Sequence, residues 1–153
     1  MRMTSFRTIA LASVLGLGAF SLSAPAFSAE IEIKMLNKGS DNQLMVFEPA
    51  AVKIAPGDTV KFVAADKGHD AISIPDLSPE GFAGINGKIS QDVTVTFDKP
   101  GAYAFKCAPH FGMGMVGLVV VGDQPANLQA IKDAKMPKKA RDRMDAEIAK
   151  LGL

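Results

Sequence analysis

Short apolar and β-branched runs, separated by turn residues, dominate most of the chain. Apolar and charged residues alternate over 31–35, which is the two-residue period of a half-buried strand. Similar runs follow at 51–54, 58–63, 71–74, 92–97, 102–107 and 115–121, and Gly, Pro and Asp residues bound them. Seven or eight short strands with this spacing predict an all-β, Greek-key β-sandwich. The chain has no internal repeat and no low-complexity tract.

The periodicity changes after Val121 to that of helices. Asp123 is suited to cap a helix that has Pro125 in its first turn. Pro137 opens a second helix, whose apolar residues share one face: Ala140, Met144, Ile148 and Leu151. We expect this stripe to pack on the sandwich. A stripe for a partner helix is the weaker alternative, because the remaining basic residues are typical of a solvated face: Lys138, Lys139, Arg141 and Arg143.

The N-terminal segment has the layout of a cleavable export signal. Arg2 and Arg7 precede a 14-residue apolar run, Ile9 to Leu22, whereas a membrane span needs about 20 apolar residues. Small residues follow, and cleavage after Ala26, Ser28 or Ala29 fits them. We therefore predict a signal peptide over 1–28, a sandwich over 29–122 and a helical extension over 123–153, with the mature chain in the periplasm. A permanent N-terminal anchor is the alternative.

Composition limits the remaining possibilities. The chain has 153 residues, of which 48% are hydrophobic, enough for one domain with a core. Its net charge of +1, which becomes −1 without the two arginines of 1–28, offers no bulk attraction to nucleic acid. A single cysteine excludes a disulfide framework, a four-cysteine zinc site and an iron–sulfur cluster held by four thiolates of one chain. After export, Cys107 must be buried and inert, or bound to a ligand.

One loop contains most of the candidate metal-binding side chains. Cysteine, histidine and methionine occur within the nine residues Cys107–Met115, between two predicted strands. Cys107 is in phase with Tyr103 and Phe105, so its side chain should point inward. Each of these residues alone is typical of a core or a turn. Together with His69, they form a thiolate, two imidazoles and a weak thioether, which suits copper cycling between Cu(II) and Cu(I). Zinc gains little from a thioether, and the loop has no carboxylate for a hard cation.

The chain over 29–153 resembles the cupredoxins, the small blue copper proteins, and among them the pseudoazurins. The resemblance rests on the segments 35–39, 45–50, 56–60 and 107–117, and on the helical extension, which plastocyanins and amicyanins lack. It implies one type 1 copper ion, with His69, Cys107, His110 and Met115 as metal ligands. Met113 lies at the spacing that amicyanins use. Met115 is preferred because Gly117 and the valines after it follow the register typical of the ligand methionine.

The ligand set predicts an electron carrier. Four protein ligands leave no open position for a substrate, so we expect no enzymatic activity. The edge of His110 is the expected exit for the electron, within an apolar patch of Met45, Pro109, Phe111 and Met113. The resemblance places Lys38, Lys67, Lys88 and Lys106 around this patch. It implies acidic redox partners, namely a copper nitrite reductase or c-type cytochromes, and a monomeric carrier. A periplasmic copper storage or delivery protein without a redox role is the alternative.

Two residues depart from the pattern of the resembled family. Asp70 follows the first histidine, where Asn is usual, and Ala108 follows the cysteine, where Thr or Ser is common. In relatives these two side chains help to tie the two ligand loops together, and Ala108 has no side-chain group to do so. We expect the backbone N–H of Asp70 to point at the sulfur.

Overall fold

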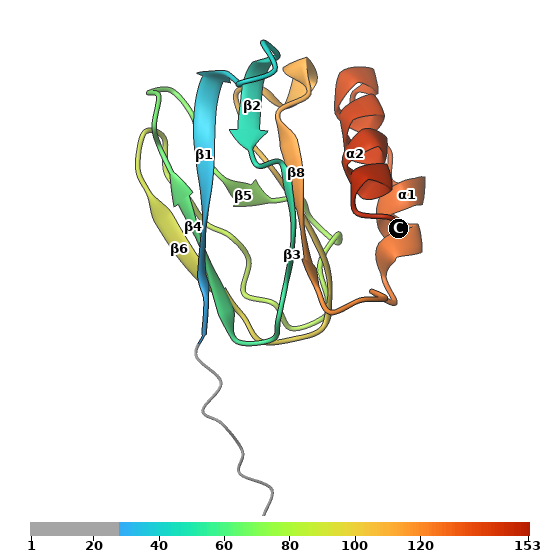
Figure 1. Cartoon of the computed structure of the whole chain (residues 1–153). Helices are drawn as coiled ribbons and strands as arrows, with labels where there is room; N and C mark the ends of the chain where they lie inside the picture. The colour runs from blue at the N-terminus through green and yellow to red at the C-terminus, as the bar shows by residue number, and fades with distance from the viewer. Residues whose placement is uncertain (1–27) are drawn as a thin grey trace, which may run out of the picture.

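Two four-stranded sheets face one another in the computed structural model, which describes residues 28–153 (Figure 1). The export signal predicted over 1–28 lies, apart from Ser28, outside the described residues. The strands are β1 (Glu30–Lys38), β2 (Leu44–Glu48), β3 (Ala51–Ile54), β4 (Asp58–Val63), β5 (Ile72–Ser73), β6 (Val93–Phe97), β7 (Gly101–Lys106) and β8 (Val116–Val121). The predicted β-sandwich is confirmed.

The two sheets differ in strand order, and each contains one parallel pair of strands. One sheet has the order β2-β1-β4-β6, and the other has the order β3-β8-β7-β5. β1 pairs with β4, and β3 with β8, in parallel, whereas the other neighbours are antiparallel. The connection from β4 to β5 passes between the two sheets and carries His69, whereas Cys107 and His110 lie in the connection from β7 to β8, within one sheet.

The main core lies between the two sheets. Ile33 and Met35 of β1, in the phase that the alternation predicts, are fully buried against residues of the opposite sheet. The ring of Phe105 packs edge-to-face against Phe47 at 4.8 Å and against Phe62 at 5.0 Å between centroids. Cys107 and Met115 belong to the same core, at its end.

A second core lies between one sheet and the C-terminal helices, α1 (Leu128–Asp133) and α2 (Lys138–Lys150), which stand beside β8 (Figure 1). All six residues of β8 are buried, because alternate side chains face the other sheet and the helices. Leu118 and Val120 pack with the helix residues Ile131, Ala140, Met144 and Ile148. The predicted packing of the second helix on the sandwich is confirmed.

Some predicted elements differ from the structure. β2 was not among the predicted runs, since Leu44–Phe47 is continuously apolar and does not alternate. β5 is shorter than the run 71–74. The predicted start of the first helix is wrong, because α1 begins at Leu128 and Asp123 is exposed. The side chain of Asn127 exchanges hydrogen bonds of 2.8 and 2.7 Å with the backbone of Ala102, so contact with β7 fixes this start.

The prediction of a solvated basic face on α2 holds for Lys138 and Lys139, which are exposed, but is wrong for two arginines. Arg141 and Arg143 are half-buried, and their guanidinium groups donate to backbone carbonyls of other elements. Burial of the aliphatic stem and multiple donors suit arginine to this role. No helix within residues 28–153 has the length and apolar content needed to cross a membrane.

Candidate metal centre

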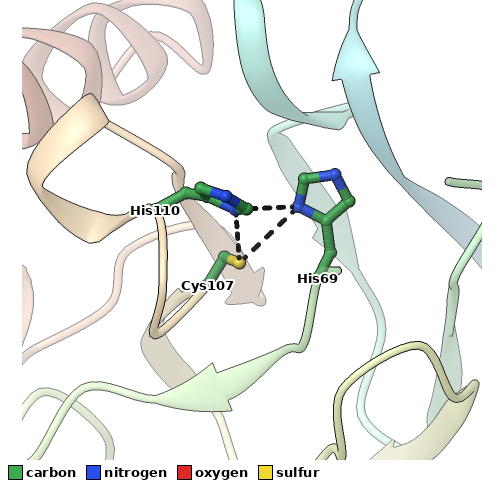
Figure 2. Close-up of side chains that lie close together, drawn as sticks. All are labelled: His69, Cys107 and His110. Atoms are coloured by element: carbon green, nitrogen blue, oxygen red, sulfur yellow. Dashed lines mark hydrogen bonds between the residues drawn. The ribbon is translucent and has the colours of Figure 1, made fainter. Parts of the chain in front are cut away.

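His69, Cys107 and His110 come together at one end of the sandwich (Figure 2). The two Nδ1 atoms lie 3.1 Å apart, and Cys107 Sγ lies 3.4 Å from His110 Nδ1 and 3.7 Å from His69 Nδ1. His69 and Cys107 are fully buried, and His110 is partly exposed. The convergence that the sequence predicts for these three residues is present in the structure.

The loop that carries Cys107 and His110 is closed by its own backbone. The N–H of Cys107 donates to the carbonyl oxygen of Met115 at 3.0 Å, directly beyond the pairing of β7 with β8. The N–H of Met115 donates in turn to His110 O at 3.2 Å. The 3₁₀ helix η1 (Phe111–Met113) then turns the chain back toward β8. These bonds hold the histidine above the thiol.

Asn37 orients the first histidine. Its Oδ1 lies 2.9 Å from His69 Nε2, so Nε2–H donates and the lone pair of Nδ1 faces the thiol. Burial, and then the neighbouring His110, lower the pKa of His69, which favours the neutral imidazole that metals bind. The sequence analysis did not assign this role to Asn37. The available signal was its phase, because Asn37 continues the inward positions of Ile33 and Met35 on β1.

Asp70 joins the two ligand-bearing loops in spite of the departures noted in the sequence. Its Oδ1 accepts a hydrogen bond of 2.7 Å from the backbone N–H of Ala108, so no hydroxyl is needed at that position. Burial raises the pKa of the Cys107 thiol, whereas N–H groups of Asp70 and His110 directed at the sulfur lower it. The expected approach of the Asp70 N–H to the sulfur is therefore present.

The spacing of the three donors fits one metal ion. Metal–nitrogen and metal–sulfur bonds of about 2.0–2.3 Å, at tetrahedral or trigonal angles, place donor pairs roughly 3.3–3.8 Å apart. The two sulfur–nitrogen separations, 3.4 and 3.7 Å, lie within this range, and the separation of the two nitrogens, 3.1 Å, lies slightly below it. A buried thiol and two imidazoles, with no carboxylate in the cluster, form a soft donor set that suits copper better than magnesium or calcium.

The two methionines of the loop have different environments. Met115 is fully buried in the same core as Cys107, whereas Met113 has 43% of its surface exposed. A thioether that completes a buried site must lie next to the buried thiol. Burial therefore favours Met115 over Met113, in agreement with the preference from sequence.

The predicted apolar patch around His110 is present only in part. Pro109 and Met113 are exposed, whereas Met45 is half-buried and packs against the main core. Phe111 packs against the helix core, and Lys106 Nζ lies 4.7 Å from the centre of its ring. Leu44, which is 56% exposed and was not predicted, lines a groove together with Met113.

Comparisons with known proteins agree with this geometry. A family model described as copper binding proteins, plastocyanin/azurin family, matches residues 33–122. The chain is 55% identical over 131 residues to a pseudoazurin of Paracoccus pantotrophus, covering 86% of this chain and 90% of the relative. It is also similar to the crystal structure of native pseudoazurin from Hyphomicrobium denitrificans. That likeness has a TM-score of 0.76 and 49% identity, and it covers 80% of this chain and 98% of that one.

The hydrogen bond from Ala108 to Asp70 predicts how the site responds to mutation. We expect Asp70→Ala to weaken copper binding about tenfold, the lower end of the range for groups that orient metal ligands. Asp70→Asn should bind nearly as well as the parent protein, because the amide oxygen still accepts the bond. Competition with a chelator of known affinity measures both. Equal affinities for Asp70→Ala and the parent would show that this bond does not stabilise the site.

Proposed function

This chain belongs to the plastocyanin/azurin family of copper-binding proteins and, within it, to the pseudoazurins, and from that premise we propose that it carries single electrons. The observation that supports the proposal is the triangle of His69 Nδ1, Cys107 Sγ and His110 Nδ1, whose atoms all lie within 4.8 Å of one another. A copper ion bound there supplies a one-electron Cu(II)/Cu(I) couple. We propose these three atoms and the thioether sulfur of Met115 as its ligands.

Rigid donors suit a carrier better than an enzyme. The residues that surround the cluster hold its donors by backbone and side-chain bonds, so the same geometry serves both oxidation states. A set of four protein ligands leaves no position for a substrate, which distinguishes it from a catalytic metal site. Full burial of Cys107 also argues against storage or delivery, since a metal that must be handed over needs an accessible donor.

His110 is the proposed exit for the electron. It is the partly exposed member of the triangle, and the exposed side chains of Pro109 and Met113 neighbour it in sequence. An apolar surface of this kind loses its water on contact with a partner, and flexible methionines adapt to several surfaces. The carrier is proposed to act as a monomer that docks briefly through this end.

The partner is proposed to be an acidic redox protein, a copper nitrite reductase or a c-type cytochrome. Three lysines lie within two residues of the site: Lys38 follows Asn37, Lys67 precedes Gly68 and His69, and Lys106 precedes Cys107. Lys88 is exposed in the segment whose Ser90 N–H donates to His69 O. The meeting place is proposed to be the periplasm, reached through the signal 1–28, with 29–122 and 123–153 as the sandwich and its helical extension.

Colour is the direct test of the proposed function. The purified chain loaded with Cu(II) should show an intense visible band from the copper–thiolate bond, and reduction should bleach it reversibly. Cys107→Ser should lose this band and most of the copper affinity, because Cys107 is the single soft anionic ligand in the chain. Retention of the intense band in that variant would refute the proposed ligand set.

The two methionines give a second test. Met115→Leu should raise the reduction potential, because loss of a weak axial donor destabilises Cu(II) more than Cu(I). Met113→Leu is the matched control, since Met113 is exposed and its loss should leave the potential nearly unchanged. Voltammetry of both variants measures the effect. The opposite ranking would assign the axial position to Met113.

The lysines predict a salt-dependent encounter with the partner. Replacing Lys38 and Lys67 by Glu should slow the second-order reaction with an acidic partner at low salt. The difference should fade as the screening length falls below about 10 Å. Lys53 and Lys99 are the control pair, because they lie near the opposite end of the sheet, where β3 and β8 end and β7 begins. Stopped-flow rates over a salt series that are equal for both pairs would exclude docking through these lysines.

A further inference from the structure

Helix α2 is fastened to the metal end of the sandwich by one half-buried guanidinium group. Arg143 Nη1 donates to the carbonyl oxygens of Gly114 at 2.7 Å and Met45 at 2.8 Å. Its Nη2 donates to Gln43 Oε1 at 3.0 Å. A single side chain of α2 thus connects the start of β2 with the end of the ligand loop, two segments that are far apart in the sequence.

Both backbone acceptors belong to residues in the left-handed conformation. Met45 has φ 52° and Gly114 has φ 89°, and the first value is uncommon for a residue other than glycine. Gly114 also lies directly against the helix, since a Cβ atom there would approach Lys139 O to 3.0 Å. The guanidinium therefore donates hydrogen bonds to the carbonyl oxygens of the two residues whose φ values depart from those of a strand.

The carbonyl of Gly114 belongs to the peptide group that contains the N–H of Met115. That N–H donates to His110 O, and the carbonyl oxygen of Met115 accepts from Cys107 N–H. The chain around the loop supplies these two bonds and a third of 3.0 Å from Val116 N–H to Gly114 O, and Arg143 adds a bond to the same carbonyl from outside the loop. Burial lowers the pKa of Arg143, but a guanidinium stays charged in proteins, so its bonds to carbonyls are charge-assisted.

We propose that Arg143 is a positioning residue for Met115, fixing the peptide group that carries the axial methionine and so setting the strength of its interaction with copper. This inference rests on the proposed function, in which Met115 is the axial ligand. Its consequence is that the helical extension takes part in tuning the copper site, in addition to covering the sheet.

Two substitutions separate geometry from charge. Arg143→Lys keeps the charge but loses the planar fork that reaches several acceptors, and Arg143→Met loses both. Arg141→Met is the matched control, because Arg141 lies on the same helix and donates to Ile131 O and Ala134 O, away from the ligand loop.

We expect both Arg143 variants to change the relative intensities of the visible copper bands, with Arg141→Met unchanged. Arg143→Lys should raise the reduction potential, because a looser methionine is a weaker donor and the charge is conserved. Both should release copper to a chelator about tenfold faster than the parent, as expected when a group that orients a ligand is lost. In the metal-free protein, the Met115 amide should exchange with solvent faster in both.

The outcomes distinguish the two proposals. A parent protein without the visible band would refute the proposed function itself. A coloured parent together with Arg143 variants whose spectrum, potential and Met115 exchange match those of Arg141→Met would overturn the role of Arg143 alone. If Arg143→Met does not fold, Arg143→Lys and the exchange measurement decide by the same criteria.

Discussion

Hydrogen bonding between β7 and β8 is the constraint on which the copper end of the molecule depends. The register runs from Gly101 opposite Val121 to Lys106 opposite Val116, and the bond from Cys107 N–H to Met115 O continues it. Because this pairing fixes both ends of the loop, the few residues between them must fold back over the thiol. A slip of one residue would turn every side chain of β7 to the other face and remove the cysteine from the core.

The bonds that the protein makes to its donors are the reason why the proposed copper site would suit electron transfer. Burial in the core and bonds to Asn37 and Asp70 hold the imidazole, the thiol and the two loops in place. The fold of the sandwich therefore restrains the donors from several sides. A change in oxidation state then requires little movement of the protein, since neither state dictates the positions of its ligands.

The alternation of apolar and polar residues predicted those strands that have one buried and one exposed face. Alternation located most strands, whereas the preference for Met115 came from the register of the resembled family's ligand loop. The sequence missed β2, whose apolar run does not alternate, and the start of α1, where Asn127 bonds to β7. It also missed the roles of Asn37 and Arg143. Both roles depend on contacts between segments that are far apart in the sequence. The residues next to Asn37 or Arg143 in the chain do not indicate which distant segment each one contacts.

The burial of β8 on both faces links the helices to the site. A sandwich without the extension would expose Leu118 and Val120 to water, so α2 has a stabilising role that requires no connection with copper. The packing nevertheless brings the first turn of α2 against Gly114, and the guanidinium of Arg143 extends this contact to the ligand loop. A strand buried on both faces is held by close-packed neighbours on each side, and such packing has low compressibility and transmits strain. The helix therefore supports the strand that follows Met115, and the proposed role of Arg143 would add control of the ligand loop to this stabilising role.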